Sequence, residues 1–273
     1  MNYIGKVKNC ARRRVLPAFV RGGSQYHLLL HGARYKGSDP MEFITFEQVE
    51  REYRVGDAVI KALNGIDFHF GRGTFNVVLG QSGAGKTTLL NLLGGMDSPT
   101  AGKIVVNGHE VSGMSERELT DYRRTQIGFV FQFYNLVPNL TALENVQLAE
   151  EICPDPLNAC EMLQRVGLGE RMNNFPSQMS GGEQQRVSIA RALAKNPQIV
   201  LCDEPTGALD SETGRKVLRL IRDVANDLGK TVIIVTHNAP IAEMAQTVLH
   251  MRDGAISQIE THEHPKDVEE IEW

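Results

Sequence analysis

The octapeptide at residues 80–87 constrains this chain more than any other feature, because it matches the pattern G-x-x-x-x-G-K-[ST] in full. It follows a short apolar stretch, residues 74–79, and opens a stretch with helical spacing, residues 86–94. Glycines let the backbone turn tightly, so that successive N–H groups point at phosphate oxygens, and the N-terminus of the next helix adds positive potential. The sequence therefore predicts a strand, a phosphate-binding loop and a helix in that order.

This loop predicts a site for a nucleoside triphosphate and a magnesium ion. We expect Lys86 to reach the β- and γ-phosphates and the Thr87 hydroxyl to ligate Mg²⁺. The residues predicted to contact the nucleotide here are Gly80, Gln81, Ser82, Gly83, Ala84, Gly85, Lys86, Thr87 and Thr88.

A pair of carboxylates follows a second apolar stretch. Asp203 and Glu204 come directly after residues 199–202, and ligands of open parallel sheets bind beyond the carboxyl ends of the strands. Asp203 can hold Mg²⁺ through its water shell, and Glu204 can orient or deprotonate the attacking water as a general base. Such a pair can also serve only as a turn or helix cap, but the phosphate loop upstream favours the catalytic interpretation.

The later part of the chain predicts a parallel α/β sheet. Residues 198–202 and 231–235 are continuous apolar runs, as in strands buried on both faces, and an amphipathic helix over 212–228 lies between them. A strand, a crossover helix and a second strand indicate parallel strands. Residues 42–49 and 58–70 are strand-like, whereas residues from about 139 to 196 have helical spacing and predict an inserted helical subdomain.

Charge divides the 273 residues into unequal parts. Residues 1–40 contain eight basic residues and one acidic residue, which leaves 21 basic and 32 acidic residues, a net charge of −11, for residues 41–273. We expect a basic, disordered extension over 1–40, with an organelle transit peptide or an arm for nucleic acid or anionic lipid as weaker alternatives. A folded domain is expected over 41–260, with a solvated acidic tail over 261–273.

Hydrophobicity argues against a membrane-spanning protein, and cysteine spacing argues against a cysteine metal site. The longest apolar runs, such as residues 232–235, are far shorter than the ~18 residues of a membrane helix, so any membrane role requires a partner. The four cysteines form no CxxC pair and no other metal-ligand spacing, which favours free thiols in a reducing cytosol.

Residues 179–186, Met-Ser-Gly-Gly-Glu-Gln-Gln-Arg, predict a helix start with an added property. Ser180 is a candidate N-cap, and Glu183 completes a capping box. The N–H groups of residues 180–182 could also face an anion, as a second phosphate-binding edge about 100 residues from the first. With this stretch the chain resembles the ATP-binding cassette (ABC) ATPases, whose signature is Leu-Ser-Gly-Gly-Gln; Met179 and Glu183 are mild departures.

The resemblance covers roughly residues 42–260. It implies an α/β fold of the P-loop class, with a parallel core sheet, an antiparallel β subdomain and the inserted α-helical subdomain. It also implies a head-to-tail dimer of two copies, in which ATP bound by one phosphate loop is contacted by Ser180 and Gly182 of the other copy. Nucleic acid is not an expected partner.

Four further positions match the family in order. The resemblance implies that Tyr53 stacks on adenine and that Gln132 senses Mg²⁺ and the membrane partner. It also implies that Asp210 links the two sites of the dimer and that His237 contacts the γ-phosphate. The catalytic residues implied are Glu204, His237 and Lys86; the metal-binding residues are Thr87, Gln132 and Asp203. Each match has a plain alternative, since Tyr53 could be a strand-face aromatic and Asp210 a helix cap.

Residues 92–102, 127–138 and 140–146 look like one branch of the family: lipoprotein release, macrolide export and antimicrobial-peptide resistance. This likeness implies an integral membrane permease with a large extracytoplasmic domain as partner, and a cytoplasmic location at the inner face of the cell membrane. Aromatic residues over 129–134 could line a groove for a permease helix or pack in a core. The alternative function is a cell-division regulator that couples ATP hydrolysis to cell-wall remodelling. The sequence identifies neither the transported substrate nor a preference for ATP over GTP.

Overall fold

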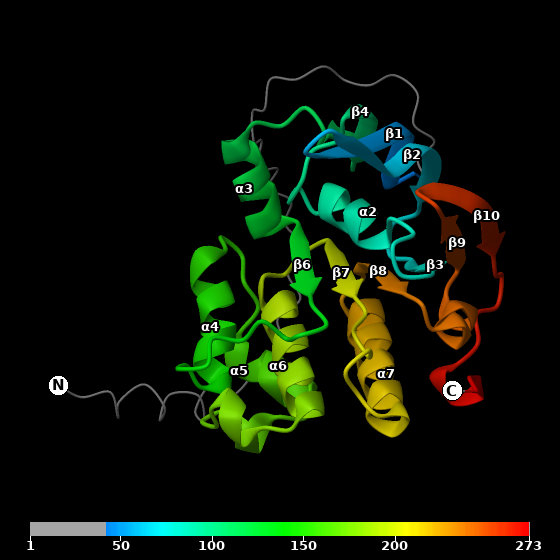
Figure 1. The fold of residues 1–273 in the computed structure, drawn as a ribbon. Coiled ribbons are helices and arrows are strands. Elements are labelled where there is room, and N and C mark those ends of the chain that lie inside the picture. Colours follow the sequence, from blue (N-terminus) through cyan, green and yellow to red (C-terminus); the bar gives the residue numbers. More distant parts are fainter. Residues whose placement is uncertain (1–41, 273) are drawn as a thin grey trace, which may run out of the picture. The chain divides into compact units, whose positions relative to one another are not determined.

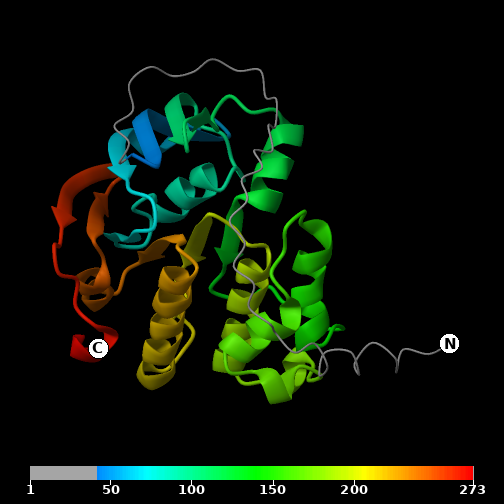
Figure 2. The same ribbon diagram turned by 180° about the vertical axis from the view of Figure 1, so that it is seen from behind.

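The computed structural model describes residues 42–272, in which the helix of residues 86–93 lies between two β-sheets (Figure 1; seen from behind in Figure 2). The extension predicted over 1–40 lies outside the described residues. The helices are α2 (Lys86–Leu93), α3 (Glu116–Thr125), α4 (Ala142–Ile152), α5 (Ala159–Arg165), α6 (Gly181–Ala194) and α7 (Ser211–Asp227). Four 3₁₀ turns are η1 (Gly169–Arg171), η2 (Pro176–Gln178), η3 (Ala239–Met244) and η4 (Val268–Glu270).

The smaller sheet is antiparallel, as the family resemblance implied. Its strand order is β2-β1-β4-β5, with Ile44 opposite both Phe70 and Val106. The strands are β1 (Ile44–Val55), β2 (Ala58–Phe70), β4 (Ala101–Val106) and β5 (His109–Glu110). Glycine at position 56 turns β1 into β2 with a φ of 59°, a conformation that suits a residue without a side chain.

The larger sheet has the order β10-β9-β3-β8-β7-β6, and all neighbours are parallel except β10 and β9. Its strands are β3 (Phe75–Gly80), β6 (Ile127–Val130), β7 (Ile199–Asp203), β8 (Thr231–Thr236), β9 (Thr247–Arg252) and β10 (Ala255–Thr261). The two strands predicted from continuous apolar runs, β7 and β8, are direct neighbours and are both central. The predicted parallel sheet is therefore confirmed.

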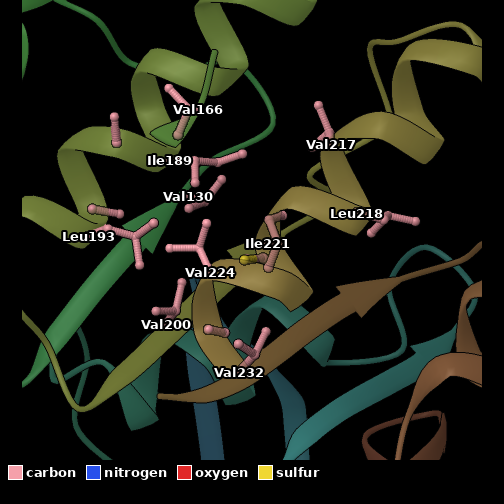
Figure 3. Packing of buried hydrophobic residues seen from close by; sticks show 14 of the residues in the cluster. Val130, Val166, Ile189, Leu193, Val200, Val217, Leu218, Ile221, Val224 and Val232 are labelled. Carbon is pink, nitrogen blue, oxygen red and sulfur yellow. The ribbon is translucent and has the colours of Figure 1, made fainter. Parts of the chain in front are cut away.

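Two apolar clusters cover the faces of the parallel sheet. Along β8, Val232 and Ile234 pack into one cluster with α6 and α7, whereas Ile233 and Val235 pack into another with α2 and the antiparallel sheet. Figure 3 shows the first cluster, where Val232 lies near residues from α6 and α7. Alternate residues of one strand thus bury on opposite faces, which explains why these strands lack a polar side.

The inserted helical region contains α4, α5 and α6, and its helices begin at polar caps. Thr141 caps α4 and Ser180 caps α6, each in a reciprocal capping box with a glutamate three residues later. Asn145 is fully buried and its side chain bonds the backbone of Val137, Leu140 and Thr141, which fixes the loop before α4.

One expectation about the end of the chain is wrong for the described residues. Residues 261–272 were expected to be a solvated acidic tail, but Val268 and Ile271 are only 1% and 3% exposed and join the α7 cluster. Two apolar residues among the acids are enough to dock the segment, because burying each one removes its side chain from water.

Membrane spans and cysteines can be assessed for the described residues only. Among residues 42–272, no helix is long and apolar enough to cross a membrane. Cys153 and Cys202 are buried free thiols, as expected, but the expectation does not hold for Cys160, which is disulfide-bonded.

Candidate functional site

The phosphate-binding loop lies between β3 and α2, as predicted. Gly85 has a φ of 96°, and a Cβ atom there would lie 2.4 Å from the carbonyl oxygen of Ala62 on β2. Only glycine fits this close approach without moving the neighbouring backbone. The loop therefore lies directly against the antiparallel sheet, which supplies one wall of the site.

Lys86 is buried beneath this loop. Its Nζ donates hydrogen bonds to the carbonyl oxygens of Gly80 at 2.8 Å and Gln81 at 2.9 Å. These bonds use two of the three donors of an ammonium group and fix its position at the loop. A buried cation held this way raises the positive potential where the loop N–H groups also point.

The strand-end carboxylate pair lies beside the loop. The Thr87 Oγ1 atom is 3.4 and 3.3 Å from the two carboxylate oxygens of Asp203. The pKa of Asp203 is raised, mainly because burial disfavours its charge. The hydrogen bond from Thr87 lowers the pKa, the neighbouring Glu204 raises it, and Lys86 lowers it. A hydroxyl and a carboxylate are oxygen ligands of the kind that Mg²⁺ prefers, with waters and phosphates completing its shell. Among the described residues, no three His, Cys, Asp or Glu side chains cluster as a metal site of their own.

Glu204 is fixed from two sides. Its Oε2 accepts a hydrogen bond from Thr236 Oγ1 at 3.0 Å, and its Oε1 lies 2.8 Å from Nδ1 of His237. An ionised carboxylate only accepts, so this geometry assigns the proton to Nδ1 of the imidazole. Glu204 also has a φ of 46°, which is disfavoured for a residue with a Cβ atom. The surrounding bonds hold the strained backbone, and strain of this kind is typical of functional sites.

These groups line one cavity of about 760 Å³. The predicted residues that line it are Gln81, Ser82, Gly83, Gly85, Lys86, Thr87, Thr88, Gln132, Asp203, Glu204 and His237. Sequence reasoning missed three lining residues on β2, which are Ile60, Lys61 and Ala62. Ile60 is 53% exposed, a property that only the structure shows, so no sequence signal indicated these three residues.

Other predicted residues lie away from the cavity wall. Tyr53 lies opposite Ile60 on β1, and its hydroxyl donates to Asp97 at 2.7 Å while Arg51 stacks on its ring. Gly80 and Ala84 support the loop from below, since a Cβ on Gly80 would lie 2.4 Å from the Met251 carbonyl oxygen and Ala84 is buried.

The second phosphate-binding edge lies at the start of α6. Ser180 is exposed there, but its N–H donates to Glu183 Oε2 at 2.8 Å, so one of the three N–H groups predicted to face an anion is already used. The bond from Ser180 N–H, above all, lowers the pKa of Glu183. Gly182 is buried against α7, where a Cβ would lie 2.3 Å from Thr213 Cγ2. Asp210, also exposed, caps α7 through the Thr213 N–H at 3.0 Å.

A phosphate loop, a strand-end Asp-Glu pair and a shared cavity define the class of P-loop nucleoside triphosphatases. A family profile described as "ABC transporter" matches residues 63–207, more than half of the chain. The chain belongs to the ABC transporter family as an ATP-binding subunit, and it is an ATPase.

Individual relatives agree with this assignment. The chain is 46% identical to an uncharacterized ABC transporter ATP-binding protein of Thermotoga maritima, over 76% of this chain and 91% of that one. It is 43% identical to the macrolide export ATP-binding/permease protein MacB of Brucella melitensis, over 78% of this chain but only 34% of that longer protein. A solved dimeric ATP-binding cassette, in a post-hydrolysis state with ADP and Pi, is 39% identical and matches 80% of this chain and 98% of that one with a TM-score of 0.74.

Proposed function

We propose that this ATPase works as a head-to-tail dimer and drives a membrane permease that exports a peptide, drug or lipoprotein-type substrate. The observation that carries the catalytic part is Glu204, held by Thr236 and His237 in the same cavity as Lys86 and Asp203. The dimeric state of the similar solved cassette supports the pairing of two copies.

In the proposed reaction, the phosphate loop and Lys86 hold the β- and γ-phosphates and reduce their repulsion toward a nucleophile. Thr87 and Asp203 would hold Mg²⁺, with Gln132 at the same wall of the cavity, and the ion would neutralise charge on the phosphates. Glu204 orients a water and accepts its proton. His237, 2.8 Å from Glu204, keeps that carboxylate aimed at the cavity.

Ser180, Gly182 and Asp210 take part through the dimer. Ser180 and Asp210 are exposed at the starts of α6 and α7 and outside the cavity of their own chain. We assign them to the site of the second copy, where the N-terminus of α6 would face the γ-phosphate. Gly182 contributes by letting the two helix starts approach each other.

A groove of about 350 Å³ is the proposed permease contact. It is lined by Phe129, Phe131, Leu148 and Ile152, with Arg191 at its side. The two rings stack with centroids 5.3 Å apart, and Leu148 and Ile152 are 43% and 54% exposed. An apolar groove of this kind suits the apolar face of a short helix. The chain would then act peripherally at the inner face of the cell membrane.

The first test replaces Glu204 with Gln, which keeps the size and removes the base. We expect ATP binding to persist, ATP to trap a dimer, and turnover to fall by ~10²-fold or more. Light scattering after gel filtration with ATP measures the dimer, and phosphate release measures turnover. Lys86→Ala is the matched control, since it should lose nucleotide affinity and form no dimer. Normal turnover by Glu204→Gln would remove Glu204 from the proposed role.

Purification of the native complex from membranes tests the partner. A large multi-helix permease with an external domain supports export, and the MacB likeness favours this outcome. Recovery of a short four-helix partner instead would indicate the cell-division function.

A further inference from the structure

The chain turns sharply just after Gln132. Tyr134 and Asn135 have φ angles of 58° and 49°, so two consecutive residues with side chains adopt the left-handed conformation. Asparagine tolerates this region, but a tyrosine there is sterically disfavoured. Such a turn persists only where neighbouring groups hold it.

Arg191 on α6 holds this turn. Its Nη1 donates to the Asn135 carbonyl oxygen at 2.5 Å, and its Nη2 donates to the Tyr134 carbonyl oxygen at 2.9 Å. A planar guanidinium can serve two adjacent acceptors at once, which an ammonium cannot do in the same geometry. Within residues 42–272 Arg191 pairs with no carboxylate, and burial lowers its pKa. The two carbonyl groups are therefore what compensates this partly buried cation.

The turn lies between the two surfaces that matter for the proposed cycle. Gln132, at one end, lines the nucleotide cavity, whereas Asn135 and Arg191, at the other end, line the apolar groove. Tyr134 extends back to the start of α6, where a Cβ on Gly181 would lie 2.7 Å from its hydroxyl oxygen. The turn thus contacts α6 at two points: the Tyr134 ring lies close to Gly181, beside Ser180, and Arg191 donates hydrogen bonds to the turn.

We propose that Arg191 is a positioning residue for ATP hydrolysis, because it fixes the turn that presents Gln132 to the nucleotide. A helix bound in the groove would act on hydrolysis through the same contact. This inference rests on the proposed role of Gln132 in the ATPase site. Arg191 itself lines the groove and not the nucleotide cavity.

The test combines a loss with a designed rescue. Arg191→Ala should lower kcat for ATP about tenfold and change KM less than about threefold, because the phosphate loop remains intact. Asn135→Gly alone should stay near wild type. The double variant R191A/N135G should recover part of kcat, since glycine removes the steric cost at position 135 while Tyr134 keeps its own. Arg117→Ala, on the exposed face of α3, is the matched control and should leave kcat unchanged.

Several results would overturn the proposal. If Arg191→Ala keeps kcat within twofold of an active wild type, this inference fails while the proposed function stands; an inactive wild type would instead refute the proposed function. A loss of kcat that Asn135→Gly does not recover even in part would show that Arg191 acts through something other than the turn. If Arg191→Ala does not fold, Arg191→Lys is used, with an intermediate kcat expected and wild-type kcat contradicting the need for the two-carbonyl contact.

Discussion

At the scale of single residues, Asp203 is a site residue whose charge lowers the stability of the folded protein. Its carboxyl group is half-buried beside Glu204, and burial is the largest reason why its pKa is raised. The folded protein therefore binds a proton on Asp203 more tightly than the unfolded chain does. Protonated Asp203 therefore stabilises the folded protein. This stabilisation is complete below the ordinary Asp pKa of 3.8 and is lost as the pH rises through the raised pKa of Asp203. At neutral pH the ionised Asp203 destabilises the fold.

Asp203→Asn should accordingly stabilise the protein at neutral pH, because it removes a charge from a half-buried site. We expect Tm at pH 7.5, without nucleotide or Mg²⁺, to rise by roughly 2 °C. The gain should shrink as the pH falls toward 3.8, while ATP hydrolysis is lost at every pH. Thermal melts across this range measure the effect. Asp57→Asn, in the exposed turn between β1 and β2, is the control, and a lower Tm for Asp203→Asn at pH 7.5 would contradict the argument.

Which site residues the sequence could predict depends on local geometry. Asp203 ends β7, His237 directly follows β8, and Lys86 follows the loop after β3, so the order of these parallel strands brings them to one edge of the sheet. Ile60 reaches the cavity from the other sheet, and no local pattern specifies how two sheets pack. The contact of Tyr53 with adenine stays a prediction, and its hydroxyl bonds Asp97, a partner 44 residues away that spacing cannot indicate.

At the scale of elements, α7 depends on the same residue that we assign to the partner's site. Asp210 caps the helix, and the bond from the Thr213 N–H, above all, lowers the pKa of its carboxyl group. Two roles in one side chain cannot be separated by a single substitution. Asparagine caps as well as aspartate but carries no charge, so it keeps one role and changes the other.

A pair of substitutions at position 210 therefore separates the two roles. Asp210→Ala should lower Tm by roughly 3 °C because the cap is lost, whereas Asp210→Asn should keep Tm within about 1 °C. If Asp210 also links the two sites of the dimer, both variants should reduce turnover, including the fully stable asparagine variant. Thermal melts and phosphate release give the two readouts. Wild-type turnover by Asp210→Asn would leave its carboxylate with a capping role only.

Elements with both an apolar stripe and a cap were predicted well, and α6 and α7 are examples. The segment around η4 was not, because its composition is dominated by acidic residues and suggests solvent. Its position is decided instead by tertiary partners, with Arg222 bonding Asp267 at 2.7 Å and Lys266 bonding Glu243 at 2.6 Å. Such partners lie in α7 and η3, far from the segment in sequence.

At the scale of the whole molecule, the segment of residues 266–271 contacts two parts of the fold that carry site residues. Its Asp267 and Glu269 pair with Arg222 and Arg219 of α7, which begins at Asp210. Lys266 pairs with η3, which begins just after His237. The segment therefore contacts both α7, which begins next to Asp210, and η3, which begins close to His237.

Ile271 should be the main anchor of this segment, because exposed ion pairs contribute little and a buried isoleucine contributes much. Ile271→Ala should lower the free energy of unfolding by about 2 kcal/mol, at the low end of the range for such truncations. Turnover at 25 °C should stay near wild type, since the residue contacts no part of the cavity. Glu272→Ala, at an exposed neighbour, is the control for urea denaturation of both proteins. Equal stability of the two variants would mean that the segment does not fasten α7. A stable Ile271→Ala protein with impaired turnover would instead assign the segment a direct part in the catalytic cycle.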